Sequence, residues 1–309
     1  MVQEELVSDL EIIDYLELFN STVESAKKLQ ISQSSCSRRY RSFSERYGIG
    51  FDRIGDRYQP TDNIDVLSSL RQASQKVRVR QGSFRVCLGW QLGNIEMRSL
   101  QHSGILLPLR PMNSWRLLSM LEQRLVDVAI MGLLEFQSLL GHQLKRLRAR
   151  RMPLSPTMQC VPIGLFDLKL LAHRSHPLQG LSDLTPEALA PFPSPALPLG
   201  MAPSLIGALQ NHGLANQPCG LTEYEEQGWE GFARDGIGLS YGAPHQLPSL
   251  DSRYGLQALN YDLGITECFG VVGHRDVLSD TGFPTLFKQS VSFLHRALNG
   301  GSGSIRWLS

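Results

Sequence analysis

The segment from Leu29 to Phe43, LQISQSSCSRRYRSF, constrains the fold of this chain most, because it predicts one helix with two contrasting faces. Ser32 can cap this helix by accepting a hydrogen bond from a free backbone N–H of the first turn, which makes Gln33 the first helical residue. Helical spacing places an apolar stripe on one side: Cys36, Tyr40, Phe43 and Tyr47. The opposite side carries short hydroxyls and long cations: Ser34, Ser35, Arg38, Arg41 and Ser42. Because such groups can reach phosphates and base edges, the helix is typical of one that reads DNA.

The flanking segments help to decide between two interpretations of this helix. An ordinary amphipathic helix with a solvated charged side is the simpler one. Two apolar stripes precede it, and each predicts a short helix: Ile12, Ile13, Leu16 and Phe19, then Val23, Ala26 and Leu29. The turn at 30–32 has the length expected inside a helix-turn-helix unit. After the helix, alternation across Phe51, Ile54 and Tyr58 predicts a short two-stranded wing.

Charge is distributed unevenly along the N-terminal part of the chain, although the formal net charge of the whole chain is only +1. Residues 1–26 contain seven acidic residues and no Lys or Arg, whereas residues 27–57 contain eight basic and three acidic residues. Eight minus three leaves +5 over the predicted helix and wing, so this region could neutralise several phosphates in a salt-dependent way. We expect the acidic first helix to face away from DNA.

A further helical pattern follows Pro60, which closes the N-terminal domain. Val66, Leu70, Ala73 and Val77 are spaced by four, three and four residues, which is typical of a helix that packs against another helix. A single amphipathic helix lying on its own domain explains the pattern equally well. Gly82 then ends the helix.

From residue 84 onward, short apolar runs alternate with helical patterns, which indicates parallel strands joined by helices. In the first half, the expected strands are 84–90, 104–109 and 126–131, and the expected helices are 94–103 and 114–124. Residues 157–164 and 166–173 are expected to form a β-pair without a helix that carries the chain to a second half. The elements expected there are strands at 196–201, 219–224 and 236–242 and helices at 204–213 and 225–235. The chain then returns at 264–274 and finishes with a helix at 285–298, so two lobes with a cleft between them are expected.

Several of these segments resemble LysR-type transcriptional regulators, in the same order and from end to end. Residues 31–38, ISQSSCSR, look like the family's V-S-Q-P-A-L-S-R, with Ser34, Ser35 and Cys36 in place of Pro-Ala-Leu. Phe51 and Arg53 look like the L-F-x-R of its first wing strand. In the second half, LVDVAIM (125–131), LLAHRSHPL (170–178) and FARDGIGLSYG (232–242) resemble the family's L-D-L-A-I, H-P-L and V-A-A-G-x-G-I-A-L-L-P. The chain is therefore similar to a divergent member of this family.

The resemblance implies an α/β protein with a winged helix-turn-helix DNA-binding domain at 1–61 and a dimerising linker helix at 62–82. A two-lobed effector-binding domain of the periplasmic-binding-protein type would occupy 83–309. It also implies a homodimer or homotetramer that binds double-stranded DNA and switches on binding a small-molecule effector. The predicted DNA-binding residues are Ser32, Gln33, Ser34, Ser35, Arg38, Arg41, Arg53 and Arg57. Gln33, Ser34 and Arg38 are expected at or near base edges, and the other three arginines at phosphates.

Ligands of two-lobed α/β domains bind beyond the carboxyl ends of the strands, where loops and helix N-termini converge. The candidate effector-binding residues are therefore those just past the predicted strands: Trp90, Gln91, Leu92, Asn113, Ser114, Met131, Gly132, Met201, Ala202, Ser204, Glu223 and Tyr224. Each of them fits a cap, turn or packing role equally well. Four of them would form an apolar wall: Trp90, Met131, Met201 and Tyr224. Because no Arg or Lys stands at these strand ends, the pattern favours a neutral or mixed ligand, with an anion held only by helix N-termini as the alternative.

The sequence gives little evidence for a catalytic site or a metal-binding site. His173 and His176 lack flanking ligands at metal-binding spacing, and the glycines at 236, 238 and 242 do not match a dinucleotide-binding motif. We therefore expect no catalytic site, no metal and no cofactor other than the effector. Five widely separated cysteines indicate reduced thiols, most of them buried. The acidic N-terminus and the absence of a long apolar run predict a cytoplasmic protein without membrane contact.

Three other functions stay open at this point. A degenerate regulator-like protein would act mainly through protein–protein interaction rather than through strong DNA binding. A solute-binding protein would use only the cleft, and an enzyme on a two-lobed fold would need a catalytic set that the sequence does not contain. Salt-dependent binding to DNA upstream of its own gene would separate the first of these from a DNA-binding regulator.

Overall fold

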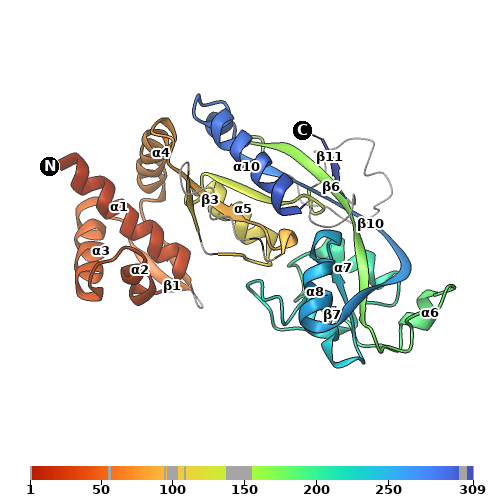
Figure 1. Ribbon diagram of the computed structural model, residues 1–309. Coiled ribbons are helices and arrows are strands. Elements are labelled where there is room, and N and C mark those ends of the chain that lie inside the picture. Colours follow the sequence, from red (N-terminus) through yellow and green to blue (C-terminus); the bar gives the residue numbers. More distant parts are fainter. Residues whose placement is uncertain are drawn as a thin grey trace.

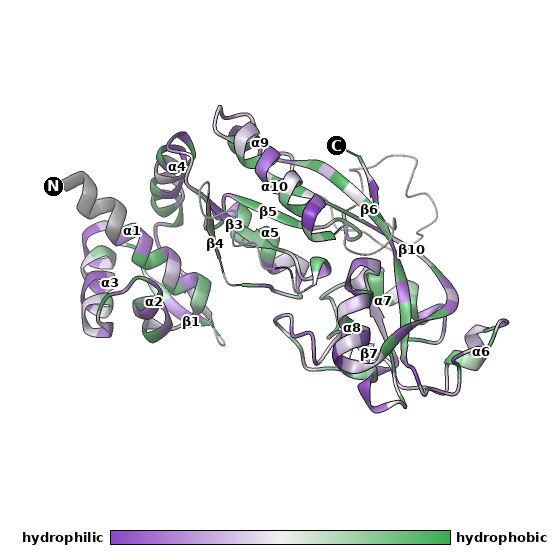
Figure 2. Cartoon of the chain, in the orientation of Figure 1, coloured by the Kyte–Doolittle hydropathy of each residue, from purple (hydrophilic) through white to green (hydrophobic). Residues whose placement is uncertain are grey.

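One helix joins an N-terminal helical unit to a two-lobed α/β region in the computed structural model of this chain (Figure 1). The structure describes residues 2–54, 57–93, 95, 104–107, 109–136, 155–298 and 305–308. Figure 2 shows that β3 and β5, in the middle of the first lobe, are mostly hydrophobic. Within this described part of the chain, none of the helices has the length and apolar character needed to cross a membrane.

The N-terminal unit contains the predicted three helices and two-stranded wing. The helices are α1 (Val2–Phe19), α2 (Thr22–Lys28) and α3 (Gln33–Tyr47). The wing strands are β1 (Phe51–Ile54) and β2 (Arg57–Pro60), which pair antiparallel.

Local sequence signals explain where α3 begins and ends and which side it buries. Ser32 caps the helix as predicted, since its hydroxyl accepts a hydrogen bond from the Ser35 N–H at 3.1 Å. Gly48 ends the helix at φ 61°, a left-handed conformation that favours glycine. Cys36 and Phe43 are buried as predicted, and Phe43 packs in one cluster with Ile13 of α1. The amphipathic pattern therefore fixes which face of α3 is left for solvent.

Helix α4 (Ile64–Arg80) joins the N-terminal unit to the rest of the chain. Its buried residues are Leu67, Arg71, Ser74, Gln75 and Val79. The predicted packing stripe lies on a different side of the helix, where Val66 is 37% and Val77 is 47% exposed. Val66, Ala73 and Val77 of this stripe are thus at the surface, whereas Leu70 is partly buried and packs against the cluster of Ile13 and Phe43.

Among the described residues, seven strands form one sheet in the order β11-β6-β10-β5-β3-β4, with β9 paired to β6. These strands are β3 (Phe84–Leu88), β4 (Gly104–Leu106), β5 (Val128–Gly132), β6 (Met158–His173), β9 (Leu239–Gly242), β10 (Leu256–His274) and β11 (Ile305–Trp307). β3 pairs in parallel with β4 and β5, and β10 pairs antiparallel with β5 and β6. Every residue of β3 and β5 is buried, as expected for parallel strands that are covered on both faces.

Two helices cover opposite faces of the sheet in the first lobe. Leu286 of α10 (Phe283–Leu298) packs in the same cluster as Phe84 of β3. Leu117 of α5 (Ser114–Glu122) packs in another cluster with Cys87, whose side chain points to the other face of the strand. The short helix α9 (Arg275–Leu278) follows β10.

The long strands β6 and β10 run through both lobes and connect them (Figure 1). The other elements of the second lobe are α6 (Pro186–Leu189), β7 (Pro195–Ala196), α7 (Pro203–Gln210), β8 (Gln217–Pro218), the 3₁₀ helices η4 (Glu230–Asp235) and η5 (Pro244–Gln246), and α8 (Leu247–Tyr254). Trp229, Tyr241 and Leu170 lie together in its core.

The prediction of a β-pair at 157–164 and 166–173 is wrong, because these residues form the single strand β6. Pro162 and Gly164 do not break the strand, since the pairing register shifts where they face Gly270 and Phe269 of β10. The strand therefore continues past Gly164 without the turn that a β-pair would need.

Three further elements of the second lobe differ from the prediction. Residues 219–224 do not form a strand, because this segment bonds to a loop of the first lobe: the Met112 N–H donates to the Thr222 carbonyl at 3.1 Å. The predicted strand at 196–201 is limited to Pro195–Ala196, since Gly200 takes φ 85°. The predicted helix at 225–235 is only the 3₁₀ helix η4, and glycines at 228 and 231 disfavour a regular helix there.

The helix predicted at 94–103 lies outside the described residues except for residue 95.

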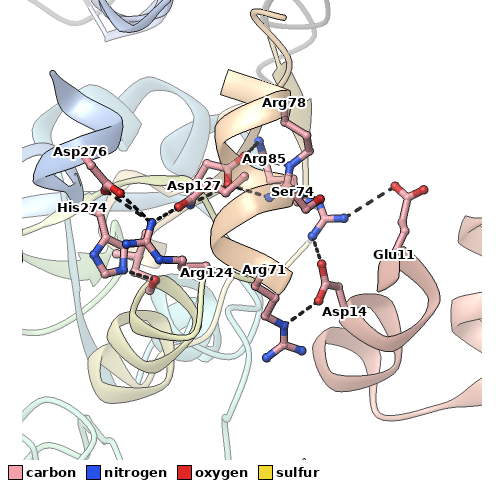
Figure 3. Close-up of polar contacts among 12 residues, drawn as sticks. Glu11, Asp14, Arg71, Ser74, Arg78, Arg85, Arg124, Asp127, His274 and Asp276 are labelled. Carbon is pink, nitrogen blue, oxygen red and sulfur yellow. Dashed lines mark hydrogen bonds and ion pairs between the residues drawn. The ribbon is translucent and has the colours of Figure 1, made fainter. Parts of the chain in front are cut away.

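A network of buried charges connects α1 and α4 to the first lobe (Figure 3). Asp14 of α1 is 1% exposed and pairs with Arg71 of α4 at 2.8 Å and with Arg85 of β3. Asp127, just before β5, accepts hydrogen bonds from Arg78 of α4 at 2.9 Å and from the Arg85 backbone N–H at 2.8 Å. Acidic side chains of α1 therefore fix the N-terminal unit against the linker helix and the first lobe.

Candidate DNA-binding surface and inter-lobe cavity

Helix α3 presents the predicted hydroxyl-rich, basic face to solvent. Ser34, Arg38, Arg41 and Ser42 are exposed, and Ser35 is partly buried. A hollow on this face is lined by Ser35, Arg38, Arg39 and Ser42. Figure 2 shows α3 mostly in the hydrophilic colours, in contrast to the middle of the sheet. Long cations and short hydroxyls are thus brought together on one exposed face.

Short polar side chains order the N-terminus of α3. The Ser32 hydroxyl lies 3.0 Å from that of Ser34 and 2.8 Å from that of Ser35. Gln33 donates from Nε2 to the Thr22 hydroxyl of α2 at 3.2 Å. The two helices of the helix-turn-helix unit are therefore tied together at this end.

The remaining cations of this region take different positions. Arg53 is exposed on β1, and Arg57 begins β2, although its side chain lies outside the described residues. Arg39 donates from Nε to Asp9 of α1 at 2.7 Å and also lines the hollow on the exposed face. Sequence reasoning did not select Lys27 and Lys28, which are exposed at the end of α2 and belong to the same positively charged stretch.

A small cavity of about 30 Å³ lies between the two lobes. Of the predicted effector-binding residues, Trp90 and Gln91 line it. Sequence reasoning missed the rest of the lining, which comes from Phe166, Leu168, Leu205, Trp229, Glu230, Tyr241, Gly242, Ala243, Gln246, Ile265 and Glu267. Trp90 and Trp229 meet edge to face, with ring centroids 5.3 Å apart, so aromatic side chains of both lobes form the wall.

Three other predicted effector-binding residues form hydrogen bonds at or next to the cavity. The Gly132 N–H donates to the Gln91 side chain at 3.4 Å. The Ser204 N–H donates to Glu135 at 2.9 Å. The Tyr224 hydroxyl donates a hydrogen bond to the Glu230 carboxyl at 3.1 Å.

The other predicted residues serve as caps, packing residues or ion-pair partners. Asn113 caps α5 by accepting from the Trp115 N–H at 2.9 Å. Glu223 pairs with Arg116 and accepts from the Arg110 N–H at 3.0 Å. The rest are packed in the protein: Leu92, Ser114, Met131, Met201 and Ala202. Of the apolar wall predicted from the sequence, only Trp90 lines this cavity.

Two buried acids line the cavity, Glu230 and Glu267, and a third, Glu135, bonds to the backbone of Leu205, which also lines it. Glu135 follows β5 and accepts hydrogen bonds from the backbone N–H groups of Ser204 and Leu205 at 2.9 and 3.0 Å. Glu267 of β10 accepts from the N–H groups of Leu133 and Leu134 at 2.9 and 3.0 Å. No Lys or Arg is among the described residues that line the cavity. The acid Glu267 inside an apolar strand was a signal in the sequence that could have identified this site.

Burial raises the pKa of Glu230 to about 8. Its carboxyl accepts hydrogen bonds from the Gln246 amide at 2.8 Å and from the Tyr224 hydroxyl. Glu230 therefore holds a proton at neutral pH and presents an uncharged carboxylic acid to the cavity. Among the described residues, no group of His, Cys, Asp and Glu has an arrangement suited to a metal ion.

The variant Glu230→Gln should alter how the stability of the protein depends on pH. Because the pKa in the folded state lies above its ordinary value of 4.5, this group's contribution to stability is fully present below about pH 4.5. It is lost as the pH rises toward about 8, whereas an amide does not titrate. Urea unfolding across this range should show that the wild type loses stability relative to Glu230→Gln. The exposed-site variant Glu122→Gln should follow the wild type, and a constant difference between Glu230→Gln and the wild type at every pH would contradict the assignment.

The exposed recognition-type helix, the linker helix and the two lobes together define the class of fold. It is the fold of full-length LysR-type transcriptional regulators, as the comparison with solved structures shows. No family model matches this sequence. No curated protein matches it either.

Three solved structures illustrate the similarity, and each is matched over nearly its whole length. A full-length OxyR variant from Pseudomonas aeruginosa is 12% identical, with a TM-score of 0.56 and coverage of 96% of this chain and 99% of that chain. A probable transcriptional regulator from Pseudomonas aeruginosa is 17% identical, with a TM-score of 0.54 and coverage of 91% and 94%. ArgP from Mycobacterium tuberculosis is 14% identical, with a TM-score of 0.53 and coverage of 94% and 97%. At this level of identity the similarity concerns the fold.

Proposed function

We propose that this chain is a LysR-type transcriptional regulator that binds double-stranded DNA through helix α3. The observation that carries the proposal is the exposed face of α3, where Arg38 and Arg41 stand beside the hydroxyls of Ser34 and Ser42. A helix of this kind, held by a preceding helix and followed by a wing, fits the major groove. The fold of the whole chain supports the same function.

Within this interface, the roles follow from side-chain chemistry and position. Gln33, Ser34 and Arg38 lie in the first half of α3 and are proposed to contact base edges or lie near them. Arg41, Arg53 and Arg57 are proposed to contact phosphates. The hydroxyls of Ser32 and Ser35 hold the start of the helix and complete the interface.

The exposed stripe of α4 supports a role for this helix in dimerisation. Val66 and Val77 are apolar residues at the surface of α4, and a second copy of α4 would remove them from water. We therefore propose domains at 1–61, 62–82 and 83–309, the second being the dimerising linker. A homodimer, or a homotetramer built from two dimers, would place two α3 helices on paired half-sites.

The cavity between the lobes is the proposed effector site, since it lies where strands of both lobes end and aromatic side chains from both converge. An effector bound there would contact both lobes at once. Its binding free energy could therefore shift the arrangement of the subunits and hence the spacing of their recognition helices. We place this activity in the cytoplasm.

DNase footprinting on the DNA that flanks the chain's own gene tests the proposed function. We expect two protected half-sites about one helical turn, roughly 10 base pairs, apart, with binding that weakens steeply as salt rises. Val77→Asp is expected to weaken the pairing of the half-sites, because it places a charge in the proposed helix–helix contact. Binding without sequence preference, or no protection even at low salt, would favour an interaction protein that no longer reads DNA.

A further inference from the structure

Arg116, in the first turn of α5, connects the N-terminal unit to the second lobe. Its Nη2 donates a hydrogen bond to the Leu18 carbonyl of α1 at 3.3 Å, and its Nη1 pairs with the carboxylate of Glu223 in the second lobe. The Arg116 side chain is only 14% exposed. One guanidinium group on the first lobe therefore bonds to both of the other parts of the chain.

The contact with Leu18 lies where a cation stabilises α1. The last carbonyls of a helix have no partner within the helix, and the helix dipole makes this end partially negative. The last turn of α1, LELF, contains no basic residue of its own. Leu18 is fully buried and packs in one cluster with Leu117 and Leu121 of α5. Arg116 thus adds a positive charge to the end of α1 that packs on the first lobe.

The same end of α1 is also bonded to the wing. Asn20 follows α1 directly, and its side-chain oxygen accepts a hydrogen bond from the Tyr58 N–H of β2 at 3.2 Å. The Asn20 N–H donates to the Leu16 carbonyl of α1 at 2.8 Å. Because these bonds lie within two residues of Leu18, the position of the wing is linked to the contact that Arg116 makes.

Glu223, the other partner of Arg116, lies at the boundary between the two lobes. Its second carboxylate oxygen accepts a hydrogen bond from the Arg110 N–H of the first lobe at 3.0 Å. The neighbouring residue, Tyr224, donates its hydroxyl hydrogen bond to Glu230, which lines the inter-lobe cavity. A movement of the second lobe relative to the first would therefore move Glu223 relative to Arg116.

We propose that Arg116 is a positioning residue through which the second lobe controls how firmly the N-terminal unit is held on the first lobe. While Glu223 pairs with Nη1, the guanidinium group is oriented so that Nη2 reaches the Leu18 carbonyl. A ligand that changes the arrangement of the lobes moves Glu223, and Arg116 then loses the partner that orients it. This coupling acts within one chain, and its effect on DNA binding rests on the function proposed above.

Hydrogen–deuterium exchange of the full chain tests this coupling without a ligand or DNA. Arg116→Ala and Glu223→Gln are each expected to speed amide exchange in peptides covering 16–20 and 57–60 by roughly three- to tenfold, because each weakens charge-assisted bonds that hold α1. The double variant should exchange no faster than Arg116→Ala, since the effect of Glu223 passes through Arg116. Asp251→Asn removes a similarly exposed carboxylate that also pairs with an arginine, and this matched control should leave both segments unchanged.

Two results of this experiment would overturn the proposal. Faster exchange in Arg116→Ala but not in Glu223→Gln would show that the second lobe has no part in holding α1. Additive effects in the double variant would show that the two residues act separately. If Arg116→Ala does not fold, Arg116→Lys replaces it, because an ammonium group keeps the charge but lacks the planar fork that bonds two acceptors at once. Unchanged exchange in Arg116→Lys would contradict the role of the guanidinium group.

Gel shifts on the DNA that flanks the chain's own gene separate the coupling from the proposed function. Glu223→Gln is expected to weaken binding by about threefold or more, because a loosely held N-terminal unit loses more freedom when it binds paired half-sites. Equal affinity of Glu223→Gln and the wild type would contradict a regulatory role of the contact. If the wild type itself does not bind this DNA, the proposed function fails, whereas the exchange measurement still decides whether the coupling exists.

Discussion

Replacing Asp14 with alanine is expected to lower the free energy of unfolding by about 3–5 kcal/mol, because it removes the buried carboxylate that two buried guanidinium groups share. Asp14, Arg71 and Arg85 are each no more than 3% exposed, so water cannot replace the lost partner. Among the described residues, Arg71 would retain Glu17, and Arg85 would retain a distant contact with Glu11 at 3.8 Å and its position over the Tyr15 ring at 5.8 Å. Urea unfolding followed by circular dichroism measures the change.

Asp251→Ala is the matched control for this prediction. It removes a carboxylate that pairs with Arg174 at 3.1 Å, but both side chains are about half exposed. Exposed pairs of this kind contribute no more than about 1 kcal/mol. A loss in Asp14→Ala as small as that in Asp251→Ala would show that the buried network does not hold α1 to the first lobe.

The effect of Asp14→Ala should also depend on pH. Burial by itself would raise the pKa of Asp14, but the charges of Arg71 and Arg85 outweigh it and hold the pKa below its ordinary value of 3.8. The stabilisation is therefore fully present above about pH 4 and is lost as the pH falls through the lowered pKa. The difference between wild type and Asp14→Ala should be constant near neutral pH and shrink in acid.

Arg38→Ala is expected to weaken binding to the protein's own operator by about 10- to 100-fold and to relax the preference at one base pair. The side chain is exposed on the second turn of α3, and the hydrogen bond it forms with a described residue is a long one to the Ser35 hydroxyl, at 3.4 Å, so it is available for a guanine edge. A bidentate arginine–guanine contact contributes about 1–3 kcal/mol of discrimination. Quantitative gel shifts at fixed salt, with the operator varied one base pair at a time, measure both effects.

Two comparison variants make this test specific. Arg41→Ala, a proposed phosphate contact, should weaken binding to all operator variants alike and reduce the salt slope by about one. Arg296→Ala removes the same charge from the exposed side of α10 and should leave binding unchanged. An unchanged base preference in Arg38→Ala would assign that side chain to the phosphate backbone instead.

The parts of the fold that were predicted correctly are those that depend on neighbours in the sequence. Ser32 caps α3 because its hydroxyl needs only the N–H three residues on, and the stripe of Cys36 and Phe43 follows from helical periodicity. The buried strands β3 and β5 were visible as short apolar runs. The second lobe was predicted less well, because its short elements are set by prolines, glycines and contacts with the first lobe.

The sequence by itself determined the amphipathic helix α3, its wing, the apolar stripe of α4 and the alternation of strands and helices, since these depend on local spacing and side-chain type. Only the tertiary structure decided which charged groups meet. Glu135 reaches the N-terminus of α7, 69 and 70 residues further along, and Arg85 reaches Asp14, 71 residues earlier. Such partners are chosen when the folded chain buries both groups together, because a buried charge is tolerated only where a partner of opposite charge or a hydrogen-bond donor faces it.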